Sequence, residues 1–201
     1  MTMKTHPSKD TRDTRQLILD SAETLILTRG YNGFSYKDIA GDVGIRKASI
    51  HHHFPSKADL GAAFVNRYVH RFRQWRERVN HLPVDQKLAA FLELFKHVSD
   101  NAEKICPMGM LTAEYPTLPK SIQESLRQLL DEMDRWLAAV LSQGQAEGYL
   151  RPEPEAQMLA KVIINAMSAS MKTARVFHDM DQLENVFNTL IHLIRFSDNC
   201  K

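Results

Sequence analysis

Two short helical segments separated by one glycine constrain the fold of this chain more than any other feature of its sequence. Ser35 is a helix-capping residue with an acid, Asp38, three positions later, a pattern that predicts the start of a helix. Gly44 ends that segment, and residues 46–54 leave room for only about two more helical turns. A short helix, a glycine-containing turn and another short helix have the spacing of a helix-turn-helix. Six apolar residues can pack the two helices together: Ile39, Ala40, Val43, Ile45, Ile50 and Phe54.

The surface left to the second of these helices contains no carboxylate. It is basic to neutral and offers hydrogen-bond donors near a helix N-terminus, which are the properties that binding in a DNA major groove requires. A helical hairpin with no nucleic-acid partner would usually carry some acids on such a face. The residues available to this surface are Arg46, Lys47, Ser49, His51, His52 and His53.

The charge distribution also favours a nucleic-acid partner for the first part of the chain. Residues 1–80 contain 14 Lys and Arg against 8 Asp and Glu, whereas residues 81–201 contain 12 against 16. A basic first third followed by an acidic remainder suggests two modules, with any polyanion bound by the first. The same net charge of +6 is also compatible with an ordinary solvated surface.

The rest of the sequence is helical, in longer pieces. Apolar residues recur at helical spacing in residues 14–29 and 57–80, on either side of the two short segments. Two prolines within four residues predict a loop at 115–119. No segment shows strand periodicity, so the predicted fold class is all-α. Further helices are expected within residues 88–95, 105–114, 121–147, 153–175 and 181–196.

Composition excludes several other classes of protein. Hydrophobic residues make up 43% and charged residues 25%, as in a globular protein rather than a disordered chain. Two cysteines, Cys106 and Cys200, cannot form a disulfide framework or a four-thiolate zinc site. No apolar run approaches the roughly 18 residues of a membrane span, and the polar start lacks the apolar core of a signal peptide. We therefore expect a cytoplasmic protein with no membrane partner.

The sequence predicts no metal centre, no catalytic residue and no cofactor. Successive residues of a helix point about 100° apart, so His51, His52 and His53 cannot ligate one ion together. No paired carboxylates, nucleophile–base spacing or metal-binding cluster indicates catalysis. An all-α enzyme or carrier with an adventitious helix-turn-helix is the alternative that these patterns leave open.

A run of residues around the two short segments follows a specific order: Gly30-Tyr31-Asn32-Gly33-Phe34-Ser35, Asp38-Ile39-Ala40, Val43-Gly44-Ile45, Lys47-Ala48-Ser49-Ile50-His51-His52-His53-Phe54, Ser56-Lys57 and Leu60. This run resembles the DNA-binding domain of the TetR family of transcriptional regulators. The resemblance implies about nine helices, with a helix-turn-helix DNA-binding domain at 12–58 and an effector-binding and dimerisation domain at 59–201. The polar, unpatterned start of the chain predicts a disordered tail at 1–11.

The function implied by the resemblance is that of a ligand-responsive transcriptional regulator. We expect a homodimeric repressor that leaves a palindromic, double-stranded operator when a small apolar or electrophilic effector binds. The sequence leaves open whether the output is repression or activation, which molecule is the effector and which genes are controlled.

Three residues are expected to approach bases, because they match family positions on the recognition helix. Lys47 and Ala48 lie at its start, and Ala48 stands where many members have glycine. His51 stands where a tyrosine often contacts a base or a thymine methyl group. The base preference of this chain therefore differs from the common family pattern in a way that the sequence does not define.

Five further residues match family positions that contact the DNA backbone. His52 and His53 are expected to meet phosphates, and Tyr36 and Arg46 to bind the backbone through side chains or amides. Lys57 is expected at a phosphate because it combines a cation with the N-terminus of the long helix that follows.

An effector cavity is expected among methionine and aromatic side chains of the second domain, which would suit an apolar or weakly polar molecule. Cys106 is either a small buried hydrophobic residue or a sensor of oxidants and electrophiles, and Glu114 either orients a polar group or pairs with a lysine. The predicted cavity residues are Phe95, Cys106, Met110, Glu114, Tyr115, Trp136 and Phe177.

The last two predicted helices are expected to form the dimer interface. Small residues on the first of them would let helices approach closely in an isologous four-helix arrangement. The predicted interface residues are Val162, Ile163, Ala166 and Ser170 on one helix and Val186, Leu190, Leu193 and Ile194 on the other.

Overall fold

The computed structural model describes residues 13–98, 103–179 and 181–196. Within these ranges the chain forms nine α-helices, one short 3-10 helix and no β-strand beyond an isolated antiparallel bridge between Leu150 and Arg195. The predicted all-α class is therefore confirmed. The predicted tail at 1–11 and Cys200 lie outside the described ranges. None of the described helices is long and apolar enough to span a membrane.

The first three helices form the predicted helix-turn-helix region: α1 (Thr14–Arg29), α2 (Tyr36–Val43) and α3 (Lys47–His53). Ser35 caps α2 in a capping box: its hydroxyl accepts a hydrogen bond from the backbone amide of Lys37, and the Asp38 carboxylate accepts one from the backbone amide of Ser35. Gly44 ends α2 with a φ of +73°, in the left-handed region that a residue with a Cβ rarely adopts. The short turn that this allows fixes how α3 crosses α2.

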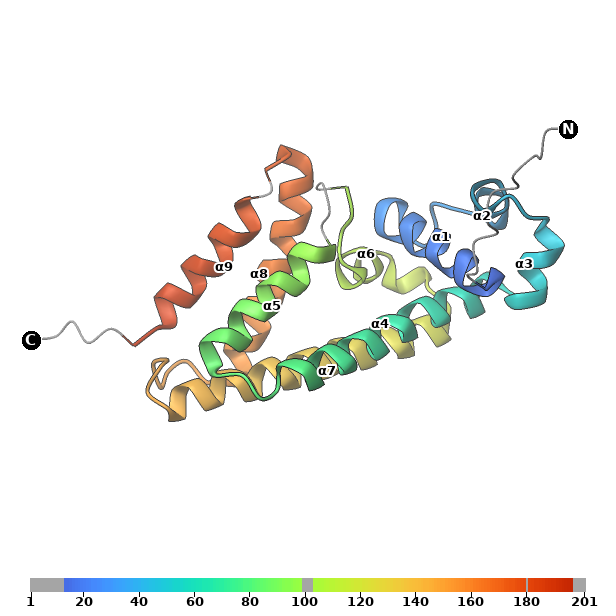
Figure 1. The fold of residues 1–201 in the computed structure, drawn as a ribbon. Helices are drawn as coiled ribbons and strands as arrows, with labels where there is room; N and C mark the ends of the chain where they lie inside the picture. Colours follow the sequence, from blue (N-terminus) through green and yellow to red (C-terminus); the bar gives the residue numbers. More distant parts are fainter. Residues whose placement is uncertain (1–12, 99–102, 180, 197–201) are drawn as a thin grey trace, which may run out of the picture.

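A long helix, α4 (Lys57–Val79), connects the helix-turn-helix to the rest of the molecule. A second capping box, between Ser56 and Asp59, determines where it starts. In Figure 1, α4 lies along most of the length of α7 (Lys120–Ala146), and the two helices form one of the largest contacts of the fold.

The remaining helices complete the second domain around α4 and α7. They are α5 (Val84–Val98), α6 (Pro107–Glu114), α8 (Ala156–Phe177) and α9 (Asp181–Ile194). The predicted loop at 115–119 contains the 3-10 helix η2 (Tyr115–Thr117). Figure 1 shows α1, α2 and α3 at one end of the molecule, α8 and α9 toward the other, and α6 between α1 and α8. The helix α6 therefore contacts both domains.

A single hydrophobic core runs from the helix-turn-helix into the second domain. Ile26 and Ile50 are fully buried at one end of it, and Leu141 and Met167 are fully buried toward the other. Because the apolar cluster is continuous, the packing of α4 in the second domain is linked to that of α1, α2 and α3.

Candidate nucleic-acid interface and internal cavity

The helix α3 presents the surface that the sequence predicts for DNA recognition. Ile50 is fully buried and anchors the helix in the core. The side chains expected near bases and phosphates point mostly to solvent, with His53 half-buried. The exposed residues on and next to α3 are Arg46, Lys47, Ala48, His51 and His52. Arg46 is the N-cap residue of α3, but its side chain forms no capping hydrogen bond. Its guanidinium is therefore not engaged at the N-terminus of the helix.

His51 is held in one orientation by two neighbours. Its ring meets the ring of Tyr36 edge-on, with centroids 4.8 Å apart. Its Nδ1 atom lies 3.1 Å from the carbonyl oxygen of Pro55. Because a carbonyl only accepts hydrogen bonds, Nδ1 must carry the proton in this contact. The other ring nitrogen, Nε2, is then an acceptor in the neutral ring, and it is the atom left for a base.

Tyr36 does not have the role that the sequence suggested for its side chain. Its hydroxyl donates a hydrogen bond to the carbonyl oxygen of Phe54 at 2.9 Å, and only 8% of the residue is exposed. Burial raises the pKa of Tyr36 to about 12. The side chain therefore joins α2 to the end of α3, and only the backbone amide of Tyr36 is left for a phosphate.

Lys57 also turns inward, so its ammonium already has partners within the protein. Its Nζ atom donates to the carbonyl oxygen of Phe34 and lies over two aromatic rings, 4.2 Å from the centroid of Phe34 and 4.6 Å from that of Tyr31. Burial lowers the pKa of Lys57, because the charged form loses hydration. Lys57 thus fastens the start of α4 to the segment between α1 and α2.

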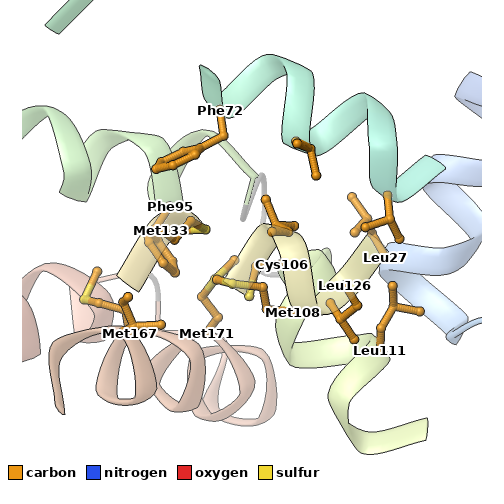
Figure 2. Close-up of a cluster of buried hydrophobic side chains, with 14 of the residues drawn as sticks. Leu27, Phe72, Phe95, Cys106, Met108, Leu111, Leu126, Met133, Met167 and Met171 are labelled. Carbon is orange, nitrogen blue, oxygen red and sulfur yellow. The ribbon is translucent and has the colours of Figure 1, made fainter. Parts of the chain in front are cut away.

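A cavity of about 800 Å³ lies in the second domain, next to the helix-turn-helix. Its walls come from α1, α4, α5, α7, the start of α6 and the segment leading into α6. Figure 2 shows several of the lining side chains in the buried cluster, with Phe72, Phe95 and Met133 on one side of Cys106 and Met108. The apolar and aromatic lining residues are Leu27, Tyr68, Phe72, Trp75, Phe95, Cys106, Met108, Leu129 and Met133.

Two of the seven residues predicted for an effector cavity line this one, Phe95 and Cys106. Trp136 packs behind the wall, with its ring centroid 4.7 Å from that of Trp75. Phe177 corrects the prediction most clearly, because it is 72% exposed at the end of α8. Met110, Glu114 and Tyr115 do not line the cavity either.

The wall residues that sequence reasoning missed come mainly from α4. Tyr68, Phe72 and Trp75 are spaced four and three residues apart, so they occupy one face of that helix. This aromatic stripe was a detectable signal. The stripe matters because the helix that starts at the DNA-binding domain also forms the wall of the cavity.

Cys106 is a structural residue in this conformation. It is 4% exposed and acts as the N-cap of α6, with Sγ accepting a hydrogen bond from the backbone amide of Gly109 at 3.3 Å. Its thiol also lies 4.0 Å from Oγ of Ser168. Burial raises the pKa of the Cys106 thiol. The reactive thiolate is therefore disfavoured, as expected for a small buried hydrophobic residue.

Glu114, at the end of α6, binds the helix-turn-helix region instead of the cavity. Its carboxylate accepts hydrogen bonds from the backbone amides of Tyr31 at 2.6 Å and Asn32 at 3.1 Å. The side-chain amide of Asn32 donates in turn to the hydroxyl of Thr117 at 2.9 Å. Gly30 has a φ of +84°, and a Cβ atom there would lie only 2.8 Å from the Glu114 carboxylate. We call this set of contacts the Glu114 clasp.

The last two helices carry apolar side chains that the protomer does not cover. On α8, Val176 is 71% exposed and shares a face with Met158 and Val162, which are also exposed. Leu193 is exposed on α9. Ile163, Ser170 and Ile194, which the sequence assigned to the interface, are instead buried inside the protomer.

The described part of the chain contains no cluster of three or more His, Cys, Asp or Glu side chains that could hold a metal ion. His52 and His53 lie with their rings edge to face, at a centroid distance of 5.3 Å.

Comparison with known proteins gives consistent relatives for both domains. Residues 18–64 match the family described as bacterial regulatory proteins, tetR family, and residues 85–190 match the tetracyclin repressor-like C-terminal domain. An HTH-type transcriptional regulator encoded in the lacX 3' region of Lactococcus lactis subsp. lactis is 28% identical over 187 residues, which cover 89% of this chain and 92% of that protein. The repressor NemR of Escherichia coli K12 is 24% identical over 140 residues, 68% of this chain and 69% of NemR.

A solved structure supports the same assignment. The crystal structure of a TetR-family transcriptional regulator from Agrobacterium tumefaciens aligns with a TM-score of 0.84 and 32% sequence identity, over 90% of this chain and 97% of that one. The matched domains, the helix-turn-helix geometry and the fold together show that this chain belongs to the TetR family of DNA-binding transcriptional regulators.

Proposed function

We propose that this regulator is a homodimeric repressor that leaves a palindromic operator when a small apolar molecule enters the cavity. One observation carries the proposal: the cavity is lined both by α4 and by α1, through Leu27 and Glu23. A ligand in it would contact the DNA-binding domain directly, as well as the helix that connects the two domains. The repressor NemR among the relatives supports repression as the output.

The DNA contacts in this proposal come from the exposed face of α3 and its N-terminal flank. Lys47 and His51 would read base edges, with Nε2 of His51 as the reading atom, while Ala48 lets the helix backbone approach. Arg46 and His52 would contact phosphates, which set register but not sequence. Lys57 and the Tyr36 side chain position these groups from inside the domain.

Dimerisation would use the uncovered apolar face of α8 together with α9. Met158, Val162 and Val176 form a stripe along α8, and Ala169 on the same face is small enough for two helices to approach closely. An isologous dimer of this kind has the two-fold symmetry that a palindromic operator requires.

The effector in this proposal binds reversibly and does not react with Cys106. The thiol is buried, caps α6, and has its pKa raised by burial, all of which oppose attack on an electrophile. The surrounding methionine and aromatic side chains instead offer dispersion contacts to an apolar molecule.

The test uses operator DNA and a variant that fills the cavity. The operator is found by footprinting on the region upstream of the regulator's own gene, and apolar compounds are selected by their ability to raise the melting temperature of the protein. Ala90 lines the cavity, whereas Ala139 is exposed on α7 and does not. Ala90→Phe should keep operator binding and lose release by these compounds, and Ala139→Phe should keep both. Normal release from the Ala90→Phe protein would contradict the proposal.

A further inference from the structure

The polar side chains that line the cavity are not neutral as a group. They are Glu23, Arg71, Arg78, Glu93, His97 and Lys104. Several of them, including Arg71 and Arg78, are exposed, so the cavity reaches the protein surface on this side. The pairing of these charges decides which ligand charge the site accepts.

Both acids of this group form ion pairs within the protein. Glu23 is 2.9 Å from Arg67 and 2.7 Å from Arg71, and its carboxylate also accepts a hydrogen bond from the Tyr68 hydroxyl. Glu93 is paired with Lys96 at 3.0 Å. Glu93 shares Lys96 with Glu184, so it is ion-paired less completely than Glu23. Arg71 is paired with Glu23.

Arg78 and Lys104 differ from these residues, because neither has an acidic side chain within ion-pair distance among the described residues. Arg78 comes from the last turn of α4, and Lys104 from the segment that leads to Cys106. The cavity therefore combines an apolar, aromatic interior with two cations that have no acidic partner in the described part of the chain.

We propose that the effector is an amphiphilic carboxylate, with its apolar body among Phe72, Trp75 and Met133 and its head group at Arg78, with Lys104 as a second cation in the cavity wall. This inference rests on the proposed function, since it names the chemical class of the molecule for that same site. The guanidinium of Arg78 can donate two parallel hydrogen bonds to a carboxylate, and the ammonium of Lys104 adds a second charge. A neutral ligand would gain no charge-assisted contact from these cations, and a cationic ligand would be repelled by them.

Three probes with the same apolar chain and different head groups test this chemistry: dodecanoate, dodecan-1-ol and dodecyltrimethylammonium, each below its micelle concentration. Binding to the full-length protein without DNA is followed by tryptophan fluorescence, because Trp75 lies in the cavity wall and Trp136 packs against it. Dodecanoate should bind at least about tenfold more tightly than the alcohol, and the ammonium compound should bind most weakly. Added salt should reduce the advantage of the carboxylate.

A double variant and its matched control assign the preference to the two cations. Arg78→Gln combined with Lys104→Gln should bring dodecanoate and dodecan-1-ol to within about threefold of each other, since both charge-assisted contacts are removed. The control, Arg151→Gln with Lys120→Gln, removes the same two residue types at exposed positions outside the cavity. It should keep the parent order of affinities.

The outcomes separate this inference from the proposed function. Equal binding of the three probes, no binding of any of them, or strongest binding of the ammonium compound would overturn the carboxylate assignment. Loss of the preference for dodecanoate over dodecan-1-ol in the control variant would also overturn the carboxylate assignment. If dodecanoate binds with the expected order but does not release operator DNA, the carboxylate site stands and the proposed release mechanism fails.

Discussion

Replacing Glu114 by alanine should destabilise the folded protein by removing the Glu114 clasp. The carboxylate accepts hydrogen bonds from two backbone amides, of Tyr31 and Asn32. A hydrogen bond to a charged group contributes about 1.5–3 kcal/mol to stability. The Tyr31 amide lies in a partly buried position, whereas Asn32 is exposed and its amide can bind water after the substitution. We therefore expect a loss of about 2–3 kcal/mol in the free energy of unfolding.

The assay is urea unfolding of the full-length protein, at a fixed protein concentration because dimerisation would contribute to stability. In thermal unfolding, the same loss should lower Tm by about 4–12 °C for a chain of this size. Glu124→Ala is the matched control, since Glu124 is exposed on α7 and takes part in no hydrogen bond or ion pair among the described residues. A loss below about 0.5 kcal/mol, or one equal to that of the control, would refute the reasoning.

The same variant should also weaken the link between ligand and DNA. The helix α6 begins at Pro107 in the cavity wall and ends at the clasp, so it touches both sites. Without the clasp, a ligand that changes the position of α6 has less effect on the segment after α1. The ratio of operator affinities without and with ligand should therefore fall in Glu114→Ala. An unchanged ratio would show that α4 alone carries the coupling.

Three other substitutions test separate parts of the structure. Lys47→Ala should cost about 1–3 kcal/mol of discrimination between operator and other DNA, measured by fluorescence anisotropy, without loss of stability. Lys57→Met should instead lower stability, because the Lys57 ammonium binds the Phe34 carbonyl. Similar DNA-binding and stability profiles for the two variants would contradict this division. Burial raises the pKa of the Cys106 thiol, so the folded state keeps its proton longer than the unfolded state, and stability should fall as pH rises above about 8.5. This decrease, measured by urea unfolding, should be smaller in Cys106→Ala. The same dependence of unfolding free energy on pH in both proteins would contradict a role for the Cys106 thiol. Val162→Asp with Val176→Asp should give a monomer in sedimentation velocity, while Ala139→Asp stays dimeric; a dimer in the double variant would exclude this face.

The sequence predicted the helices well because their signals are local. Ser35 with Asp38, and Ser56 with Asp59, lie within one turn of each other, so each capping box forms wherever the rest of the chain goes. The glycine at position 44 likewise ends α2 through its own backbone conformation. The exposure of α3 followed from the same local pattern, since burying Ile50 leaves the polar side chains of a short helix outside.

The cavity and the orientations of particular side chains were less predictable, because they depend on residues far apart in the chain. Glu114 binds amides 83 and 82 residues away, which no local pattern reveals. Lys57 has the sequence position of a phosphate contact but finds a carbonyl and two aromatic rings inside its own domain. Phe177 is apolar in sequence yet exposed, because the end of α8 extends beyond the protomer core.

The length of α4 determines how small a movement can prevent DNA binding. Trp75 lies 18 residues after the start of α4 at Lys57, a distance of about 27 Å along a helix. If the helix pivots at the cavity as a rigid rod, a tilt of about 6° displaces its far end by about 3 Å. In a symmetric dimer both ends move, so the separation of the two recognition helices changes by more than the rise of about 3.4 Å per base pair. A rotation of only a few degrees is therefore enough to bring the protein out of register with its operator.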